Sequence, residues 1–265
     1  MLANCRLIHP PMAEGAYNLA KMNRYGSLAL VGSGEYLPQM IEFEGSLIKD
    51  GLANGKKPIY LQIPTAAAQE SDHRINYWQQ LGAKAAQNLG VTQSFLPIFT
   101  REDADNPELL KTISDAALIY LSGGDPHYLA NTLRNTLAWD LIFKGWQSGA
   151  SLAGCSAGAM VLSDLIPHFR LSRSEPTKGF GLLKEVRVIP HFDKFFKWIP
   201  DSAAKVLLDL PGDEVLIGID EDTAVVKRAE KDWQVWGKGR LHILKGESPG
   251  QHQAGEFVKL GSQIL

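Results

Sequence analysis

The segment from Gly154 to Gly158 (GCSAG) places Ser156 between two glycines, each two residues away. An apolar run ends at Gly154, and Ala159 to Leu162 has the composition of a helix start. A serine on such a strand–turn–helix junction lies on a strained turn, with a helix N-terminus close to where an oxyanion would form. The segment predicts Ser156 as the nucleophile of a serine hydrolase and the Ala157 amide as an oxyanion donor.

A second glycine turn, Leu121 to Asp125 (LSGGD), follows another apolar run. Adjacent glycines let the backbone approach a ligand and leave their amides unhindered. We therefore expect Gly124 to supply the second oxyanion donor. Cys155 is a rival nucleophile, but it lies one residue off the apex of the Ser156 turn, so its thiol should point into the packing.

The serine needs a general base, and the chain has seven histidines. His191 directly follows the apolar run Val186 to Ile189, which places it at the carboxyl end of a strand. His127, beside the glycine pair, is the second candidate, and His242 lies within a strand, where a structural role is the simpler interpretation.

The base in turn needs a carboxylate to orient it. Glu175, in a loop between nucleophile and base, is the preferred candidate. Asp164, Asp193 and the acidic cluster Asp220–Asp222 compete with it, although a cluster between two strands is more often a solvated turn.

Short apolar runs that end in turn residues alternate with longer amphipathic stretches. This alternation predicts an α/β fold, a mostly parallel sheet with helices on both faces and extra C-terminal strands that extend the sheet or lie at its edge. Ligands bind at the carboxyl ends of strands in such sheets, so the turns after the first, fourth and fifth strands should converge on one cleft. The predicted strands are 27–31, 58–63, 93–98, 116–121, 151–154, 186–189, 215–219, 224–227, 234–236 and 240–244, and the predicted helices are 74–88, 107–114 and 128–148.

The 265 residues carry a net charge of −2, which gives no electrostatic footprint for nucleic acid or an anionic membrane. No apolar run approaches the ~20 residues of a membrane span. The two cysteines, Cys5 and Cys155, indicate a reducing cytoplasm. We expect residues 1–21 to be an N-terminal extension and residues 22–265 to be a single domain, whose edge strands could pair in a homodimer.

Four segments together resemble the cyanophycinase and aspartyl dipeptidase (dipeptidase E) family of serine peptidases: GCSAGA from Gly154, LSGGD from Leu121, IPHF from Ile189 and GIDEDTA from Gly218. The resemblance runs from about Leu28 to Val226. It implies a flavodoxin-like fold similar to class I glutamine amidotransferases, with serine replacing the usual cysteine.

The resemblance also implies a Ser-His pair completed by an acid, and metal-free hydrolysis next to an aspartyl residue through an acyl-enzyme. Ser156, His191 and Gly124 carry over as nucleophile, base and oxyanion donor, and Glu175 is the nearest match for the acid. We therefore expect a small peptide substrate and neither a cofactor nor a metal.

Departures from the family concern the substrate. Ile189-Pro190 stands before the histidine where cyanophycinases tend to have Asp-Gln, and the arginines that would hold an aspartyl carboxylate have no clear counterpart. Arg173, Lys194 and Lys197 are the candidate replacements. Gly34 and Asp125, from the two glycine turns, are further candidates for lining the substrate cleft.

Two other classes of function stay open. An α/β-hydrolase esterase shares the serine turn, but only His242 and His252 come late enough in the chain to serve as its base. A non-catalytic binding protein on an amidotransferase-like scaffold would be favoured by an incomplete triad. A nucleotide site at Gly32-Ser33-Gly34 would lack the third glycine of the dinucleotide fingerprint.

Overall fold

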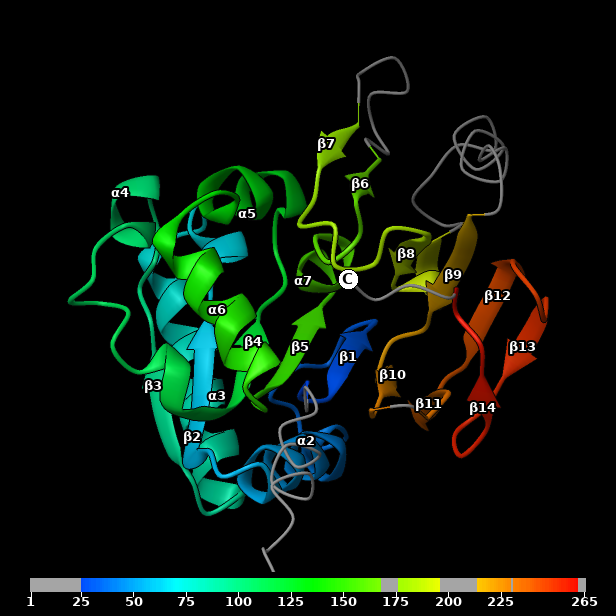
Figure 1. The fold of residues 1–265 in the computed structure, drawn as a ribbon, viewed down its shortest axis with the longest axis horizontal. Coiled ribbons are helices and arrows are strands. Elements are labelled where there is room, and N and C mark those ends of the chain that lie inside the picture. Colours follow the sequence, from blue (N-terminus) through cyan, green and yellow to red (C-terminus); the bar gives the residue numbers. More distant parts are fainter. Residues whose placement is uncertain (1–24, 168–175, 196–213, 230, 262–265) are drawn as a thin grey trace, which may run out of the picture.

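The computed structural model describes residues 25–167, 176–195, 214–229 and 231–261. The expected 1–21 extension lies outside these ranges. Five parallel strands form the first half of the fold, in the order β1-β5-β4-β2-β3 (Figure 1). These strands are β1 (Leu28–Val31), β2 (Lys57–Ile63), β3 (Thr92–Phe95), β4 (Ala116–Leu121) and β5 (Ser151–Cys155).

Helices and 3-10 turns connect these strands. They are α2 (Ile41–Ala53), η1 (Thr65–Ala67), α3 (Asp72–Asn88), α4 (Arg101–Ala104), η2 (Ile113–Asp115), α5 (Pro126–Leu133), α6 (Leu137–Gln147) and α7 (Ala157–Met160). No helix in the described ranges is long and apolar enough to cross a bilayer. The predicted α/β class, with a mostly parallel central sheet, is confirmed.

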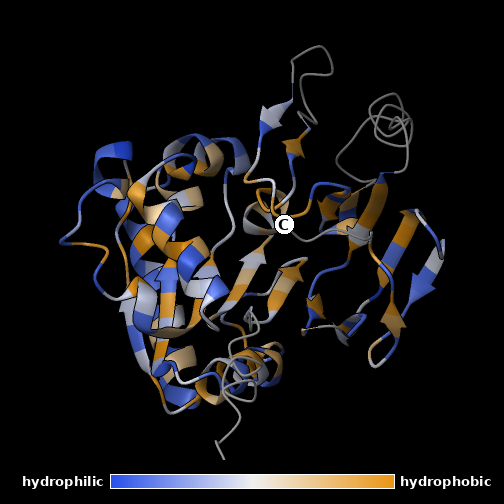
Figure 2. Cartoon of the chain, viewed as in Figure 1, coloured by the Kyte–Doolittle hydropathy of each residue, from blue (hydrophilic) through white to orange (hydrophobic). Residues whose placement is uncertain are grey.

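Successive side chains of each strand point to opposite faces, and both faces are buried. On β1, Leu28 and Leu30 join one hydrophobic core, whereas Ala29 and Val31 join another. The first core includes residues of α5, α6 and α7, and the second includes residues of α2 and α3. Burial on both faces explains the nearly continuous apolar runs. In Figure 2, β1 is largely hydrophobic, whereas the helices carry both hydrophobic (orange) and hydrophilic (blue) residues.

The C-terminal strands divide between two sheets. Three of them, β10 (Thr223–Lys227), β11 (Trp233–Gly237) and β14 (Phe257–Val258), extend the main sheet in antiparallel pairing beyond β1. Four others form a second sheet in the order β13-β12-β9-β8, with β8 at Val186–Pro190, β9 at Val215–Ile219, β12 at Leu241–Lys245 and β13 at Gly250–His252. The short elements β6 (Leu165–Ile166), β7 (Thr177–Lys178) and α8 (Phe192–Phe195) complete the described chain.

The crossings between the sheets depend on two turns. Asp222, between β9 and β10, has φ 51°, and Gly237, at the end of β11, has φ 104°. A Cβ on Gly237 would lie 2.1 Å from the Asp222 carbonyl oxygen, so the two turns are packed against each other. The expectation that the predicted C-terminal strands extend one sheet, or lie at its edge, holds for β10 and β11, whereas β8, β9 and β12 belong to the second sheet.

Two predicted helices differ from the structure. The stretch 107–114 forms turns that end in η2, and Asn106 Oδ1 accepts the Glu108 amide at the start of these turns. The stretch 128–148 is broken into α5 and α6 at Asn135, whose φ is 59°. Thr136 then caps α6 by accepting the Trp139 amide.

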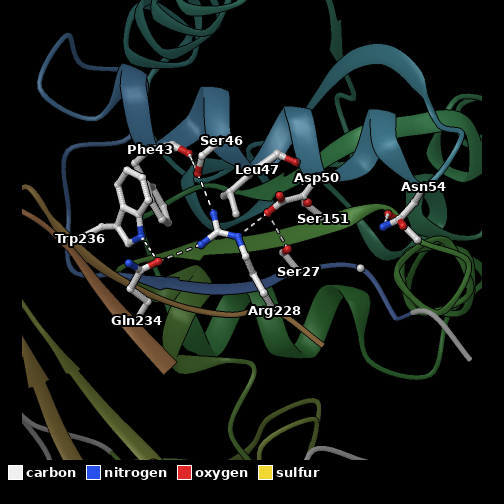
Figure 3. Close-up of polar contacts among 12 residues, drawn as sticks. Ser27, Phe43, Ser46, Leu47, Asp50, Asn54, Ser151, Arg228, Gln234 and Trp236 are labelled. Carbon is white, nitrogen blue, oxygen red and sulfur yellow. Dashed lines mark hydrogen bonds and ion pairs between the residues drawn. The ribbon is translucent and has the colours of Figure 1, made fainter. Parts of the chain in front are cut away.

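Arg228, just after β10, ties the antiparallel strands to helix α2 (Figure 3). Its Nε donates to Asp50 Oδ2 at 2.7 Å, and its two other guanidinium nitrogens donate to Ser46 Oγ and Gln234 Oε1. Asp50 also accepts the Ser27 hydroxyl at 2.7 Å. This cluster therefore holds the β10–β11 edge against the N-terminal half of the fold.

Candidate active site

Ser156 occupies a strained turn at the end of β5. Its φ is 51° and its ψ −109°, and α7 begins at the next residue. A Cβ on Gly154 would lie 2.2 Å from the Gly158 carbonyl oxygen, and one on Gly158 would lie 2.3 Å from the Leu121 carbonyl oxygen. Both positions require glycine for the close approach of strand and helix, as the strand–turn–helix interpretation expects.

His191 lies beside Ser156, and a carboxylate lies behind His191. The distance from Ser156 Oγ to His191 Nε2 is 3.0 Å, and the distance from His191 Nδ1 to Glu221 Oε1 is also 3.0 Å. A carboxylate can only accept, so the Nδ1 proton is donated to Glu221 and Nε2 is left to accept the serine hydroxyl. His191 directly follows β8 and has φ 50°. This hydrogen-bonded chain has the arrangement of a Ser-His-acid triad.

Glu221 is held by three neighbours. Besides His191, Lys194 donates to its second oxygen, and Asp193 accepts its backbone amide at 3.0 Å. Burial alone would raise the pKa of the Glu221 carboxyl, but the hydrogen bonds from Lys194 and His191 outweigh it and hold the pKa below its ordinary value. The carboxylate is therefore ionised wherever a histidine base would be neutral.

The predicted oxyanion donors flank this chain. Gly124 has φ 139°, and a Cβ there would lie 2.3 Å from the Ala66 carbonyl oxygen. Within the described ranges, neither the Gly124 amide nor the Ala157 amide donates to another residue. The neighbouring Gly123 amide is occupied, because it donates to Glu35 Oε1 at 2.9 Å.

A cavity of about 250 Å³ opens beside Ser156. It has an apolar wall of Leu37, Tyr77, Trp78 and Leu81, and its two carboxylates besides the triad are Glu35 and Glu70. The described lining contains neither lysine nor arginine. The full lining is Ser33, Gly34, Glu35, Leu37, Glu70, Tyr77, Trp78, Leu81, Gly123, Gly124, Ser156 and His191.

The turns after β1, β4 and β5 thus converge on one cavity, as expected from the strand order. Gly34, Gly124 and Ser156 all line it. Asp125 instead caps α5 by accepting the amides of His127 and Tyr128. Lys194 is paired with Glu221 and is outside the cavity lining.

Three predicted residues, Arg173, Glu175 and Lys197, lie outside the described residues. Glu221, which belongs to the Asp220–Asp222 cluster that competed with Glu175 for the role of the acid, is the carboxylate that contacts His191 in the structure. The one available signal was the position of the Asp220–Asp222 cluster directly after a strand end, which is where site residues gather in such sheets.

The other candidate histidines contact other groups. His242 Nε2 lies 2.9 Å from Asp220 Oδ1, and His127 Nδ1 lies 2.8 Å from Thr177 Oγ1. The interpretation of His242 as structural fits this pairing. The histidine that contacts Ser156 Oγ is His191, whereas His252, the other base that the esterase alternative could use, contacts Glu256.

The Cys155 thiol is fully buried and donates to Glu35 Oε2 at 2.8 Å. Burial raises the pKa of this thiol well above its usual range, and the nearby Glu35 raises it further. A neutral, buried thiol is a poor nucleophile, so Ser156 is the better candidate of the two. Glu35 itself was missed by the sequence analysis. Among the described residues, no three His, Cys, Asp or Glu side chains are gathered to hold a metal ion.

Comparison with known proteins places this site in a family. The profile of peptidase family S51 matches residues 28–233. The cyanophycinase of Synechococcus elongatus is 30% identical over 169 residues, covering 60% of this chain and 51% of the cyanophycinase, so the chain matches about half the length of that relative. An uncharacterized peptidase of Listeria innocua is 27% identical over 205 residues, covering 74% of this chain and 90% of that protein.

Two solved structures are similar. The crystal structure of a peptidase from an acI-B1 actinobacterium has a TM-score of 0.86 and 65% sequence identity, over 89% of this chain and 97% of that one. A putative peptidase E from Listeria monocytogenes shares the fold at a TM-score of 0.59 with 19% identity, over 81% of this chain and 99% of that one. With the family profile covering most of the residues that build the site, the chain belongs to peptidase family S51.

Proposed function

We propose that the chain is a serine peptidase that hydrolyses a peptide or isopeptide bond in a small aspartyl-containing peptide through an acyl-enzyme. The observation that carries the proposal is the unbroken chain Ser156–His191–Glu221, with both hydrogen bonds at 3.0 Å, on a strained turn at the cavity. Membership of family S51 supports the same reaction class.

The first half of the reaction forms an ester. Ser156 Oγ attacks the scissile carbonyl carbon while its proton passes to His191 Nε2, and Glu221 stabilises the imidazolium that results. The carbonyl oxygen becomes an oxyanion, for which the Gly124 and Ala157 amides are the proposed donors. Collapse of this intermediate breaks the C–N bond, and the leaving amine takes the proton from His191.

The second half releases the acid. Water gives a proton to His191 Nε2 and attacks the ester carbonyl, and the new oxyanion is held by the same amides. When the C–O bond to Ser156 breaks, the proton returns from His191 to Ser156 Oγ. The free enzyme is restored, and the hydrolysis of one peptide bond has used one water molecule.

The cavity wall indicates which kind of residue is joined to the aspartyl residue in the substrate. Tyr77, Trp78 and Leu81 offer an apolar surface, while Glu35 and Glu70 oppose a second acidic side chain. We therefore propose that the residue joined to aspartate is apolar or cationic, and that its side chain packs on this wall.

A panel of aspartyl and isoaspartyl dipeptides tests the proposal. Hydrolysis of Asp-Leu or Asp-Phe at least about tenfold faster than Asp-Glu is expected, since an apolar contact of this size is worth about 1–3 kcal/mol. Ser156→Ala should abolish turnover and labelling by a fluorophosphonate, and His191→Ala should do the same while His242→Ala should not. Labelled wild-type protein that cleaves no peptide would refute the substrate class, and unchanged activity in Ser156→Ala would refute the mechanism. A wild-type protein that is neither labelled nor active would favour the binding-protein alternative.

A further inference from the structure

Glu35 is a buried carboxylate in the loop that follows β1. Its side chain lines the cavity beside Ser156, although the residue is only 7% exposed. One oxygen accepts the Gly123 amide at 2.9 Å and the other accepts the Cys155 thiol at 2.8 Å. The two oxygens therefore bridge two segments that are distant from Glu35 in sequence, by 88 and 120 residues.

Each segment carries a group that the proposed reaction uses. Gly123 immediately precedes Gly124, whose amide is a proposed oxyanion donor, and Cys155 immediately precedes the nucleophile Ser156. A Cβ added to Gly123 would lie 2.9 Å from Glu35 Oε1 and 3.4 Å from Ser156 Cβ. The glycine turn is thus confined between the carboxylate and the nucleophile.

The hydrogen bond to Glu35 also gives the two glycine amides different roles. The Gly123 amide is directed at Glu35 and is lost as an oxyanion donor, so the orientation of the peptide before Gly123 is fixed. Because Gly124 has φ 139° and fits against the Ala66 backbone, the next amide has little freedom once that peptide is fixed.

We propose that Glu35 is a positioning residue that sets the distance between the Gly124 oxyanion donor and the Ser156 hydroxyl. This inference rests on the proposed serine-peptidase function. A carboxylate close to a developing oxyanion is electrostatically unfavourable by itself. Its contribution is therefore geometric, and an uncharged acceptor of the same shape should preserve most of it.

The test is the second-order rate constant for fluorophosphonate labelling of Ser156, which needs both nucleophile and oxyanion donors but no known peptide. Glu35→Ala should slow labelling by about 100-fold, the scale seen when an oxyanion donor is lost. Glu35→Leu removes both acceptors but fills the space, and it should slow labelling equally. Glu35→Gln can still accept the Gly123 amide, so its rate should stay within about tenfold of the wild type.

Two readouts separate positioning from general damage. In the Glu35 variants, the affinity for a peptide aldehyde, which forms a tetrahedral oxyanion on Ser156, should fall by the same factor as the labelling rate. The pH at which the labelling rate is half-maximal should be the same in these variants as in the wild type. Asp50→Asn is the matched control, because it removes a carboxylate from the Arg228 cluster rather than from the site (Figure 3). It should lower the melting temperature and leave the labelling rate unchanged.

The outcomes are distinct. If wild-type protein is not labelled, the proposed function itself fails. If wild-type protein is labelled and either folded variant, Glu35→Ala or Glu35→Leu, reacts within threefold of it, the positioning role is overturned. A Glu35→Gln variant as slow as Glu35→Leu would also overturn it, since charge rather than hydrogen-bond geometry would then be responsible.

Discussion

Replacing Glu221 by glutamine tests which carboxylate completes the triad. In the structure, Glu221 Oε1 accepts the proton on His191 Nδ1. Glutamine keeps the size of the side chain but removes the charge that stabilises the imidazolium. It can also turn its NH₂ toward Nδ1, which would favour the wrong tautomer of the histidine.

The size of the effect follows from the charges. Opposite unit charges about 4 Å apart near a protein surface interact by about 4 kcal/mol. The side chains of His191 and Glu221 are 42% and 30% exposed, and Lys194 shares the carboxylate. Retaining half of the interaction gives about 2 kcal/mol, or about a 30-fold loss of kcat. KM should change by less than about threefold, because the imidazolium forms only after substrate has bound.

The assay is steady-state hydrolysis of the best dipeptide by Glu221→Gln and by two comparison variants. Glu256→Gln alters another His–Glu pair, in which His252 Nδ1 lies 3.1 Å from Glu256, and it should leave kcat unchanged. Glu175→Gln decides between the two acids. The assignment would be refuted if Glu221→Gln kept its kcat within threefold of the wild type while Glu175→Gln lost it.

Three other perturbations probe the surroundings of the triad. Gly124→Ala should lower kcat at least about tenfold and cost about 1–3 kcal/mol in urea unfolding, because a Cβ would meet the Ala66 carbonyl at an unfavourable φ; wild-type values for both quantities would contradict the oxyanion role of this turn. Cys155 should resist alkylation by iodoacetamide at neutral pH until the protein is unfolded, since burial and Glu35 raise the pKa of its thiol; peptide mapping that finds Cys155 modified in active protein would disprove this. Burial raises the pKa of Glu44 to about 8, so the folded protein keeps a proton that the unfolded chain releases near 4.5. The free energy of unfolding should therefore fall by as much as about 5 kcal/mol as the pH rises through that window. Glu44→Gln should flatten this dependence, and equal slopes for both proteins would show that Glu44 does not hold the proton.

Local patterns were enough to predict the parallel half of the sheet and to single out Ser156 and His191, whose side chains lie 3.0 Å apart in the structure. The need for glycines around Ser156, and the position of His191 after a strand end, can be inferred from the few residues on either side. The partners of the C-terminal strands are not visible in this way, because short apolar runs fit either sheet equally well. Their division depends on the turns at Asp222 and Gly237, which pack against each other across the fold.

Contacts between distant segments also explain why the sequence ranked Glu221 below Glu175 and gave no sign of Glu35. Glu221 lies in the turn between β9 and β10, which belong to different sheets, and it contacts His191, which follows β8. Glu35 has no local feature that marks it, and its two donors, Gly123 and Cys155, come from other loops. Both carboxylates make their contacts between segments far apart in the chain.

The pairing of β10 with β1 also matters for the order in which the residues of the site are completed during synthesis. Ser156 precedes His191 by 35 residues, and His191 precedes Glu221 by 30. The parallel strands β1 to β5 are all made before the segment with Glu221, which directly precedes β10, the strand that pairs with β1. With the proposed roles, a nascent chain therefore carries its nucleophile well before the acid of its triad, and we expect hydrolytic activity only after β10 has been made.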